Sequence, residues 1–241
     1  MSRLPLLACC AVLSATFTGC AAMHSIVVQG NGSVERAERS VSAFEKITLS
    51  GEGEIVLQQG DREELTIETD SNLMEWIETE VDGNELKIRT KPGHFLRPSK
   101  SIRYLVTVRN LEAVTMSGSG SVSSEDLTCD KLHLSISGSA DANLEGLDAK
   151  SLQIDISGSG KFIGVGKADE FTVKIAGSGK IWTKNMESKS VKVSVSGSAE
   201  IEVWATEQLN VNVAGSGTVR YKGDAKVKQS VAGSGSVSKI D

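Results

Sequence analysis

The chain has 241 residues, a formal net charge of −5 at pH 7, 24 glycines and only four cysteines. This length is sufficient for one large β domain or two small ones, with a substantial core. The acidic balance disfavours nucleic acid as a partner, because binding to a phosphate backbone relies on clustered Lys and Arg.

The N-terminus is typical of an export signal. Arg3 precedes a mainly apolar run from Leu4 to Phe17, which ends in Thr18-Gly19-Cys20 and resembles a bacterial lipobox. The run is shorter than the roughly 20 apolar residues that a membrane-spanning helix needs. We therefore expect residues 1–19 to be a lipoprotein-type signal peptide and Cys20 to carry lipid.

An ordinary cleaved signal is the alternative, because lipoboxes favour Leu, Val or Ile where this chain has Phe17. Cleavage would then fall near Ala21 or Ala22. In both cases the mature chain leaves the cytoplasm. We expect it in the bacterial cell envelope, lipid-anchored at a membrane, and we favour the outer one. Its partners would be that membrane and either a glycan or an envelope protein.

Cysteine usage excludes a disulfide framework within the mature chain. Cys9 and Cys10 leave with the signal and Cys20 would carry lipid, so that only Cys129 remains. No His/Asn arrangement accompanies Cys129, and we interpret it as a small buried or half-buried residue rather than a nucleophile.

The segment after the signal lacks strand-like alternation. It contains Gly30-Asn31-Gly32-Ser33, and we predict that residues 20–37 form a flexible tether between lipid and fold. The region 41–110 is less regular than the rest. It predicts strands around 56–57, 65–67, 80–81, 86–88 and 104–108, a helical turn or two over 71–77, and a loop over 91–99.

A repeated tripeptide dominates the remaining sequence. Gly-Ser-Gly or Gly-Ser-Ala begins at seven positions spaced by 18 to 20 residues, with a related Gly51-Glu52-Gly53 upstream: Gly118, Gly138, Gly158, Gly177, Gly197, Gly215 and Gly233. Residues two and four before each first glycine, and four after it, are apolar almost every time. Alternation with period two predicts strands with one buried face.

These features predict an all-β protein, a single-stranded parallel β-helix or β-solenoid with coils of about 18–20 residues. The domain would span residues 38–241. Parity places both small residues of each corner inside, where the absence of a large side chain permits a sharp bend. Gln229, which replaces an apolar residue in the last coil, predicts a polar end cap.

Two stretches carry a family resemblance: Val41 to Ile47, and Arg109 to Val114 followed by Ser117-Gly118-Ser119-Gly120. With the later corners they resemble the family called putative auto-transporter adhesin, head GIN domain, over about residues 38–241. The resemblance implies a parallel β-helix-like fold in envelope proteins, often lipoproteins. It brings no catalytic residues.

The sequence contains no recognisable phosphate-binding, metal-binding or catalytic motif. Gly158-Ser159-Gly160-Lys161 lacks the spacing and the helix of a phosphate-binding loop, and His24, His94 and His133 have no partner at metal-ligand spacing. We therefore expect no metal, no cofactor and no catalytic residue. Several carboxylates point outward by parity but are scattered over different columns, as a solvated face requires: Asp141, Asp155, Glu200 and Glu202.

Two outward features are candidates for binding. The middle residue of each corner should stack into a column of hydroxyls, although turn chemistry alone also favours Ser there: Ser119, Ser139, Ser159, Ser178, Ser198, Ser216 and Ser234. Trp182 shares an outward column with Ile163, and Trp204 points outward in the next coil. These aromatics either anchor a partner or are covered by loops.

The sequence therefore favours a non-catalytic envelope or surface lipoprotein, an adhesin-like or structural binding module. A carbohydrate-binding or carbohydrate-active β-helix protein is the alternative.

Overall fold

The computed structural model describes residues 25–240, and the predicted signal peptide and Cys20 lie outside them. The described part is almost entirely β structure. Its elements in chain order are β1 (Ile26–Gln29), β2 (Val34–Arg39), β3 (Lys46–Gln59), β4 (Glu64–Asp70), the 3-10 helix η1 (Ser71–Trp76), β5 (Ile77–Asp82), β6 (Glu85–Thr90), β7 (His94–Arg97), β8 (Arg103–Val108), β9 (Ala113–Ser124), β10 (Leu127–Lys222), β11 (Lys226–Gly233) and β12 (Ser236–Lys239).

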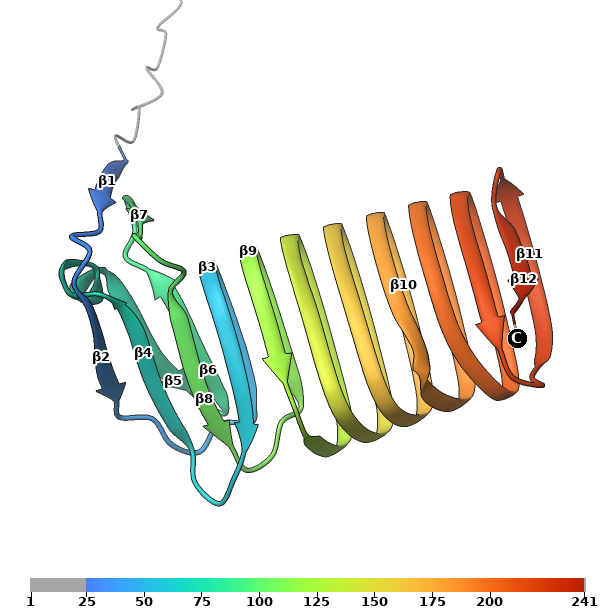
Figure 1. Cartoon of the computed structure of the whole chain (residues 1–241), viewed down its shortest axis with the longest axis horizontal. Helices are drawn as coiled ribbons and strands as arrows, with labels where there is room; N and C mark the ends of the chain where they lie inside the picture. The colour runs from blue at the N-terminus through green and yellow to red at the C-terminus, as the bar shows by residue number, and fades with distance from the viewer. Residues whose placement is uncertain (1–24, 241) are drawn as a thin grey trace, which may run out of the picture.

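One long sheet, mostly parallel, runs through the molecule, so the predicted all-β class is confirmed. Its strand order is β11-β10-β9-β3-β8-β4-β2. Figure 1 shows β10 winding back and forth as a row of turns between β9 and β11. Parallel pairing joins equivalent residues of neighbouring corners: Gly138↔Gly118 and Gly233↔Gly215 are one repeat apart, and Gly118↔Gly51 joins the first repeated corner to its upstream relative. The sequence period is thus the spacing of hydrogen-bonded neighbours.

The core lies where parity predicted it. Of the residues two and four before each corner, every one from the Gly51 corner to the Gly215 corner is buried: Ile47, Leu49, Val114, Met116, Leu134, Ile136, Ile154, Ile156, Val173, Ile175, Val193, Val195, Val211 and Val213. Phe162 and Phe171 add fully buried rings at a centroid distance of 6.3 Å. Burial of each such side chain stabilises the fold by about 1.5–3 kcal/mol.

The first glycine of each corner does not point inward, so that part of the prediction is wrong. Gly177 is exposed, with φ at 126°, and a Cβ built on it would lie 2.4 Å from the carbonyl oxygen of Gly158. This backbone conformation interrupts the inward-outward alternation, so that any side chain at this position would point at the backbone of the neighbouring turn. Gly179, by contrast, is buried as predicted, and the equivalent positions hold Ala140 and Ala199.

The irregular region has most of its predicted elements, and a strand where a loop was expected. β4, β5, β6 and β8 occupy the predicted strand positions, and η1 covers the predicted helical turn. β7 lies inside the predicted loop 91–99. Its residues pair in parallel with β1, from Ile26↔His94 to Gln29↔Arg97.

The predicted tether is also wrong from residue 26 onward, because β1 and β2 are both strands. β2 pairs antiparallel with β4 over Val34↔Asp70 to Arg39↔Leu65. Neither strand buries a face, and their residues are mostly exposed. Their pairing partners are 26 or more residues away, so no local alternation marked them.

The C-terminal end is polar where the earlier turns are apolar. Gln229 pairs with Val211 in register and is exposed, whereas Val211 is buried. Val231 is 38% exposed at the same end. β11 thus covers the last buried layer while its own inner residues meet solvent.

A buried carboxylate connects the N-terminal segments. Asp70 is fully buried, and its oxygens accept hydrogen bonds from the backbone amides of Gly32 (2.6 Å) and Ser99 (2.7 Å) and from the Ser99 hydroxyl (2.7 Å). A Cβ on Gly30 would lie 2.3 Å from the Asp70 Oδ2. Gly30 therefore has to be a glycine for this contact to form.

Candidate binding surface

The serines in the middle of the seven corners form one exposed line. All are exposed, and within residues 25–240 none of their hydroxyls has a protein hydrogen-bond partner: Ser119, Ser139, Ser159, Ser178, Ser198, Ser216 and Ser234. Ser139 pairs with Ser119 in register. Neighbouring strands lie about 4.8 Å apart, so the hydroxyls are spaced at that interval. We call this line the serine strip.

A shallow hollow of about 400 Å³ lies over the middle of the serine strip. Its lining includes Ser159, Ser178, Ser198 and Ser216. The strip is continuous with a second line of small residues, one position before each corner, that includes the exposed Ser117, Ser137, Ser157 and Ser196. Sequence reasoning missed this second line, although a Ser or Ala precedes each of the seven repeated corners.

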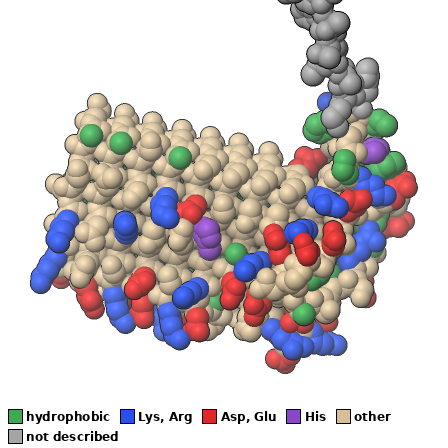
Figure 2. Space-filling model, turned by 180° about the vertical axis from the view of Figure 1, so that it is seen from behind, with side chains coloured by type: hydrophobic (Ala, Val, Ile, Leu, Met, Phe, Trp, Pro, Cys, Tyr) green, Lys and Arg blue, Asp and Glu red, His purple; other side chains and the backbone are tan. Residues whose placement is uncertain are grey.

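Figure 2 shows a broad face of the turns on which charged side chains are absent from the upper part and gather along the lower margin. Such a face offers hydroxyl and backbone groups rather than charges. Its chemistry is that of hydrogen bonding to a neutral, extended ligand.

The two tryptophans differ in accessibility. Trp182 is 36% exposed, and the Nζ atoms of Lys161 and Lys180 lie 5.8 and 5.9 Å from its ring centroid. Trp204 is only half-exposed and is covered by Lys222, whose Nζ lies 4.0 Å from the ring centroid. Of the predicted aromatic pair, Trp182 is the one available to a partner.

Trp182 borders a hollow of about 410 Å³ that it shares with Ile163, Glu200, Glu202 and Arg220. Glu200 also lines the hollow on the serine strip. The two candidate features are therefore neighbours on the surface.

The outward carboxylates are all held by cations. Arg220 Nη2 lies 2.5 Å from Glu200 Oε1 and 2.9 Å from Glu202 Oε1. Lys161 Nζ lies 3.6 Å from Asp141 Oδ2. Each of these carboxylates therefore has a cation on a neighbouring turn as its ion-pair partner.

Asp155 contacts the ring of His133, with Nε2 and Oδ2 2.9 Å apart, and lies 3.9 Å from Lys174 Nζ. His94 stacks on Trp76 at a centroid distance of 4.1 Å. Over the described residues, no three His, Cys, Asp or Glu side chains converge as metal ligands.

Cys129 is half-buried, as predicted. Burial, together with the charges of Asp130 and Asp148, raises the pKa of its thiol to about 11. A raised pKa disfavours the thiolate, which is the nucleophilic form.

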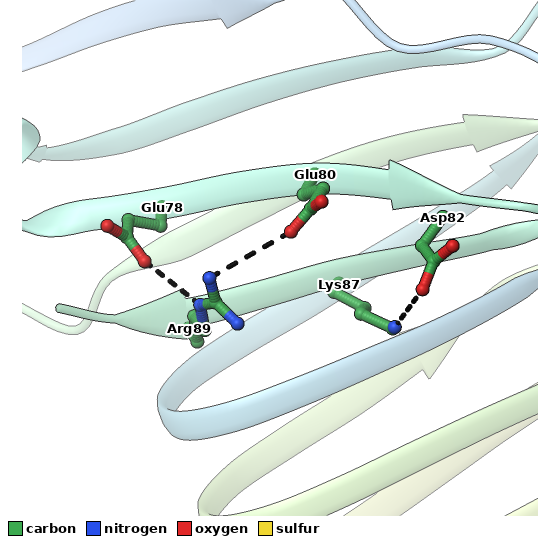
Figure 3. Close-up of polar contacts among 5 residues, drawn as sticks. All are labelled: Glu78, Glu80, Asp82, Lys87 and Arg89. Carbon is green, nitrogen blue, oxygen red and sulfur yellow. Dashed lines mark hydrogen bonds and ion pairs between the residues drawn. The ribbon is translucent and has the colours of Figure 1, made fainter. Parts of the chain in front are cut away.

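The hairpin of β5 and β6 carries a second charged group, shown in Figure 3. Arg89 lies between Glu78 (2.9 Å) and Glu80 (3.9 Å), and Lys87 contacts Asp82 at 2.6 Å. Every charge in this group has a cross-strand partner. Pairs of this kind support strand register, and we assign the group that role.

The described chain is thus an all-β protein with a long, mostly parallel sheet whose turns carry an exposed line of hydroxyls. No helix among the described residues is long and apolar enough to cross a bilayer. The model of the putative auto-transporter adhesin, head GIN domain family matches residues 43–225, so the chain belongs to that family. The search of curated proteins finds no match.

Three solved bacterial structures illustrate the similarity. A putative adhesin from Bacteroides fragilis is 26% identical, with a TM-score of 0.82, over 88% of this chain and 100% of that one. A putative lipid binding protein from Parabacteroides distasonis is 25% identical, with a TM-score of 0.75, over 89% and 100%. A putative adhesin from the same organism is 28% identical, with a TM-score of 0.67, over 89% and 100%.

Proposed function

We propose that this chain is an exported, lipid-anchored envelope protein that acts by binding, in the manner of an adhesin, and not by catalysis. Residues 1–19 would be removed as a signal peptide and Cys20 would carry the lipid. The family to which the chain belongs and the two similar putative adhesins support a surface role. The similar putative lipid binding protein supports a location at a membrane.

We further propose that residues 38–241 form one β-solenoid. The pairing register supports this, because each corner glycine from Gly138 to Gly233 approaches the carbonyl oxygen of the first glycine of the corner before it. A stack of this kind is rigid, because every turn is held by the two beside it. A rigid rod suits a module that presents a surface away from a membrane.

The observation that carries the binding role is the serine strip. Seven exposed hydroxyls have no hydrogen-bond partner in the part of the chain that the structure describes, and they recur at one position of successive turns. Such a row matches a ligand that is itself repetitive. An extended neutral polymer can hydrogen-bond to several turns at once, so that many weak contacts add up. Glycans and the exposed strands of an envelope protein both have this character.

A binding experiment tests the strip. Binding of the chain from residue 21 onward would be measured on an array of glycans and on purified bacterial envelopes. The double variant Ser178→Asp/Ser198→Asp places two charges on adjacent turns. A neutral polymer would have to remove water from both charges without pairing them, so binding should fall at least roughly tenfold. The double variant Ser236→Asp/Ser238→Asp, which changes exposed serines outside the strip, is the matched control.

Unchanged binding by Ser178→Asp/Ser198→Asp would remove the serine strip from the proposal. Turnover of a bound sugar would overturn the non-catalytic assignment. Lipid attachment is tested separately: palmitate labelling of the full chain should disappear in Cys20→Ala, and labelling that persists would contradict anchoring at this residue.

Carbohydrate binding is the second candidate, and one observation favours it. Trp182 lies beside the hollow on the serine strip, and an exposed indole is a surface on which a sugar ring can stack. If sugars bind here, Trp182→Ala should weaken their binding more than Trp204→Ala, because Lys222 already covers the Trp204 ring. Equal losses in both variants would contradict this candidate.

A further inference from the structure

The two-stranded sheet of β1 and β7 stands apart from the long sheet, at the end opposite β11. Figure 1 shows both strands projecting beyond the end of the row of turns, where the described chain begins. The two strands pair only with each other within residues 25–240. Figure 2 shows hydrophobic side chains gathered at this end of the molecule.

The three most exposed large hydrophobic residues of the described chain lie on these two strands. Phe95 is 63% exposed, Ile26 is 59% exposed and Val27 is 51% exposed. Val27 and Phe95 are register partners and therefore share one face of the pair. Exposure of a phenyl ring and two aliphatic side chains at one tip is costly in water and indicates an apolar partner.

The charged residues on the segments that form this tip are all Lys or Arg, whereas acidic residues lie on neighbouring elements. Segments 25–33 and 91–101, which form the two strands and their connections, contain Lys91, Arg97 and Lys100 but no Asp or Glu, although the whole chain has a net charge of −5. Arg97 and Lys100 are exposed and form no ion pair within the described chain, and Lys91 Nζ lies 5.5 Å from the Trp76 ring centroid. Glu75 on η1 is an exposed acid on a neighbouring element.

We infer that this tip, Ile26, Val27 and Phe95 with the flanking Arg97 and Lys100, docks on the surface of a phospholipid bilayer. The apolar side chains would enter the boundary between headgroups and acyl chains, and the two cations would contact lipid phosphates. We name these five residues the β1–β7 tip.

The position of the tip in the chain supports a bilayer as its occupant. This step rests on the anchoring proposed above. Ile26 is six positions after Cys20, which limits the distance between the tip and the lipid to about 20 Å. A second contact so close to the anchor would set the direction in which the row of turns leaves the membrane.

Vesicle binding tests the inference without the anchor. The chain from residue 21 onward lacks Cys20 but keeps every described residue, and its co-flotation would be measured with vesicles of phosphatidylcholine alone and with 30% phosphatidylglycerol. We expect binding to the anionic vesicles that weakens with added salt. Phe95→Ser should lower the partition coefficient roughly tenfold, because the variant has no phenyl ring to bury in the bilayer.

Matched variants distinguish binding through the tip from non-specific binding of the protein to vesicles. Trp182→Ser removes an exposed aromatic from the long sheet and should leave vesicle binding unchanged. Arg97→Glu/Lys100→Glu should reduce binding to anionic vesicles, whereas Lys226→Glu/Lys228→Glu at the far end should not. Equal losses in tip and control variants would overturn the inference.

The two proposals fail in different ways. If the unlipidated chain binds no vesicle while palmitate labels Cys20 in the full chain, the tip inference is wrong and the anchor stands. If labelling fails while Phe95-dependent vesicle binding is found, the anchor is wrong and the tip is supported. A dimer that Phe95→Ser dissociates, without vesicle binding, would show that a second copy covers the tip and would overturn the inference.

Discussion

Asp70 receives two hydrogen bonds from Ser99, one from the backbone amide and one from the hydroxyl, both at 2.7 Å. A third comes from the amide of Gly32. Asp70 ends β4, Ser99 lies between β7 and β8, and Gly32 lies between β1 and β2. One buried carboxylate therefore joins the end of β4 to the connections that follow β1 and β7, the two strands of the β1–β7 tip.

These contacts predict a dependence of stability on pH. The hydrogen bond from the Ser99 amide is the largest of the effects that lower the pKa of Asp70 below its ordinary value of 3.8. A carboxyl with a lowered folded-state pKa stabilises the fold above its unfolded pKa, and this contribution is lost as pH falls through the folded value. Asp70→Asn should lower Tm at pH 7 by roughly 5 °C or more.

The same variant should also reduce the loss of Tm between pH 5 and pH 3, because it has no carboxyl to protonate at this site. Thermal melts at pH 7, 5 and 3 check both expectations. Asp61→Asn is the control, since Asp61 is exposed and forms no hydrogen bond or ion pair within the described chain. A wild-type Tm for Asp70→Asn at pH 7 would contradict the assigned role.

The two small residues of a corner should respond differently to the same added methyl group. Gly177→Ala forces a Cβ against the Gly158 carbonyl in a backbone conformation that is restricted to glycine, and should cost about 2 kcal/mol or more. Gly179→Ala places its Cβ 2.8 Å from the end of the Ile175 side chain, which can rotate. Urea unfolding of both variants measures the difference, and equal midpoints would contradict it.

A ladder of alternating charge crosses five turns and predicts an effect of charge reversal. Its members are one repeat apart: Asp130, Lys150, Asp169, Lys189 and Glu207. Lys150 lies 2.6 Å from Asp130, and Lys189 lies 2.8 Å from Asp169. Figure 2 shows acidic and basic side chains alternating along the lower margin of this face.

Lys150→Glu would place an acid between two others, and like charges on adjacent strands repel. We expect Tm to fall by a few degrees, and the loss to shrink in 1 M salt, where exposed charges are screened. Lys192→Glu makes the same charge change at an exposed lysine without an ion pair in the described chain. A loss that is equal in both variants, or insensitive to salt, would rule out the ladder as its cause.

Much of the long sheet could be predicted from the sequence because its signals are local. Alternation around each corner identified Val173, Ile175 and their equivalents as core, and the same parity placed the serine strip outside. The charge ladder was also readable, since Asp130, Lys150 and Asp169 are spaced by the repeat length. It was not predicted because its members lie between the corners, outside the Gly-Ser-Gly motif by which the turns were aligned.

The rest depended on contacts that no local pattern reports. The first glycine of each corner stands at an inward position in the alternating sequence pattern. Its positive φ turns it outward, toward the backbone of the neighbouring turn, and the sequence pattern does not report this. β1 and β7 pair across more than 60 residues and bury little, so neither looked like a strand. Asp70 resembled any other acid until three distant amide and hydroxyl groups met at its carboxylate.

The surroundings of Cys129 predict an unreactive thiol. Its pKa of about 11 leaves roughly a hundredfold less thiolate at pH 8 than an ordinary thiol would have. A chain from residue 21 onward contains Cys129 alone, so its reaction with a disulfide reagent at pH 8 reports this site. We expect the folded chain to react at least roughly tenfold more slowly than the same chain in guanidinium. The difference in rate is smaller than the difference in thiolate population, because a thiolate of higher pKa is a stronger nucleophile. Equal rates would show that neither burial nor the flanking Asp130 protects the sulfur, and would restore Cys129 as a candidate nucleophile.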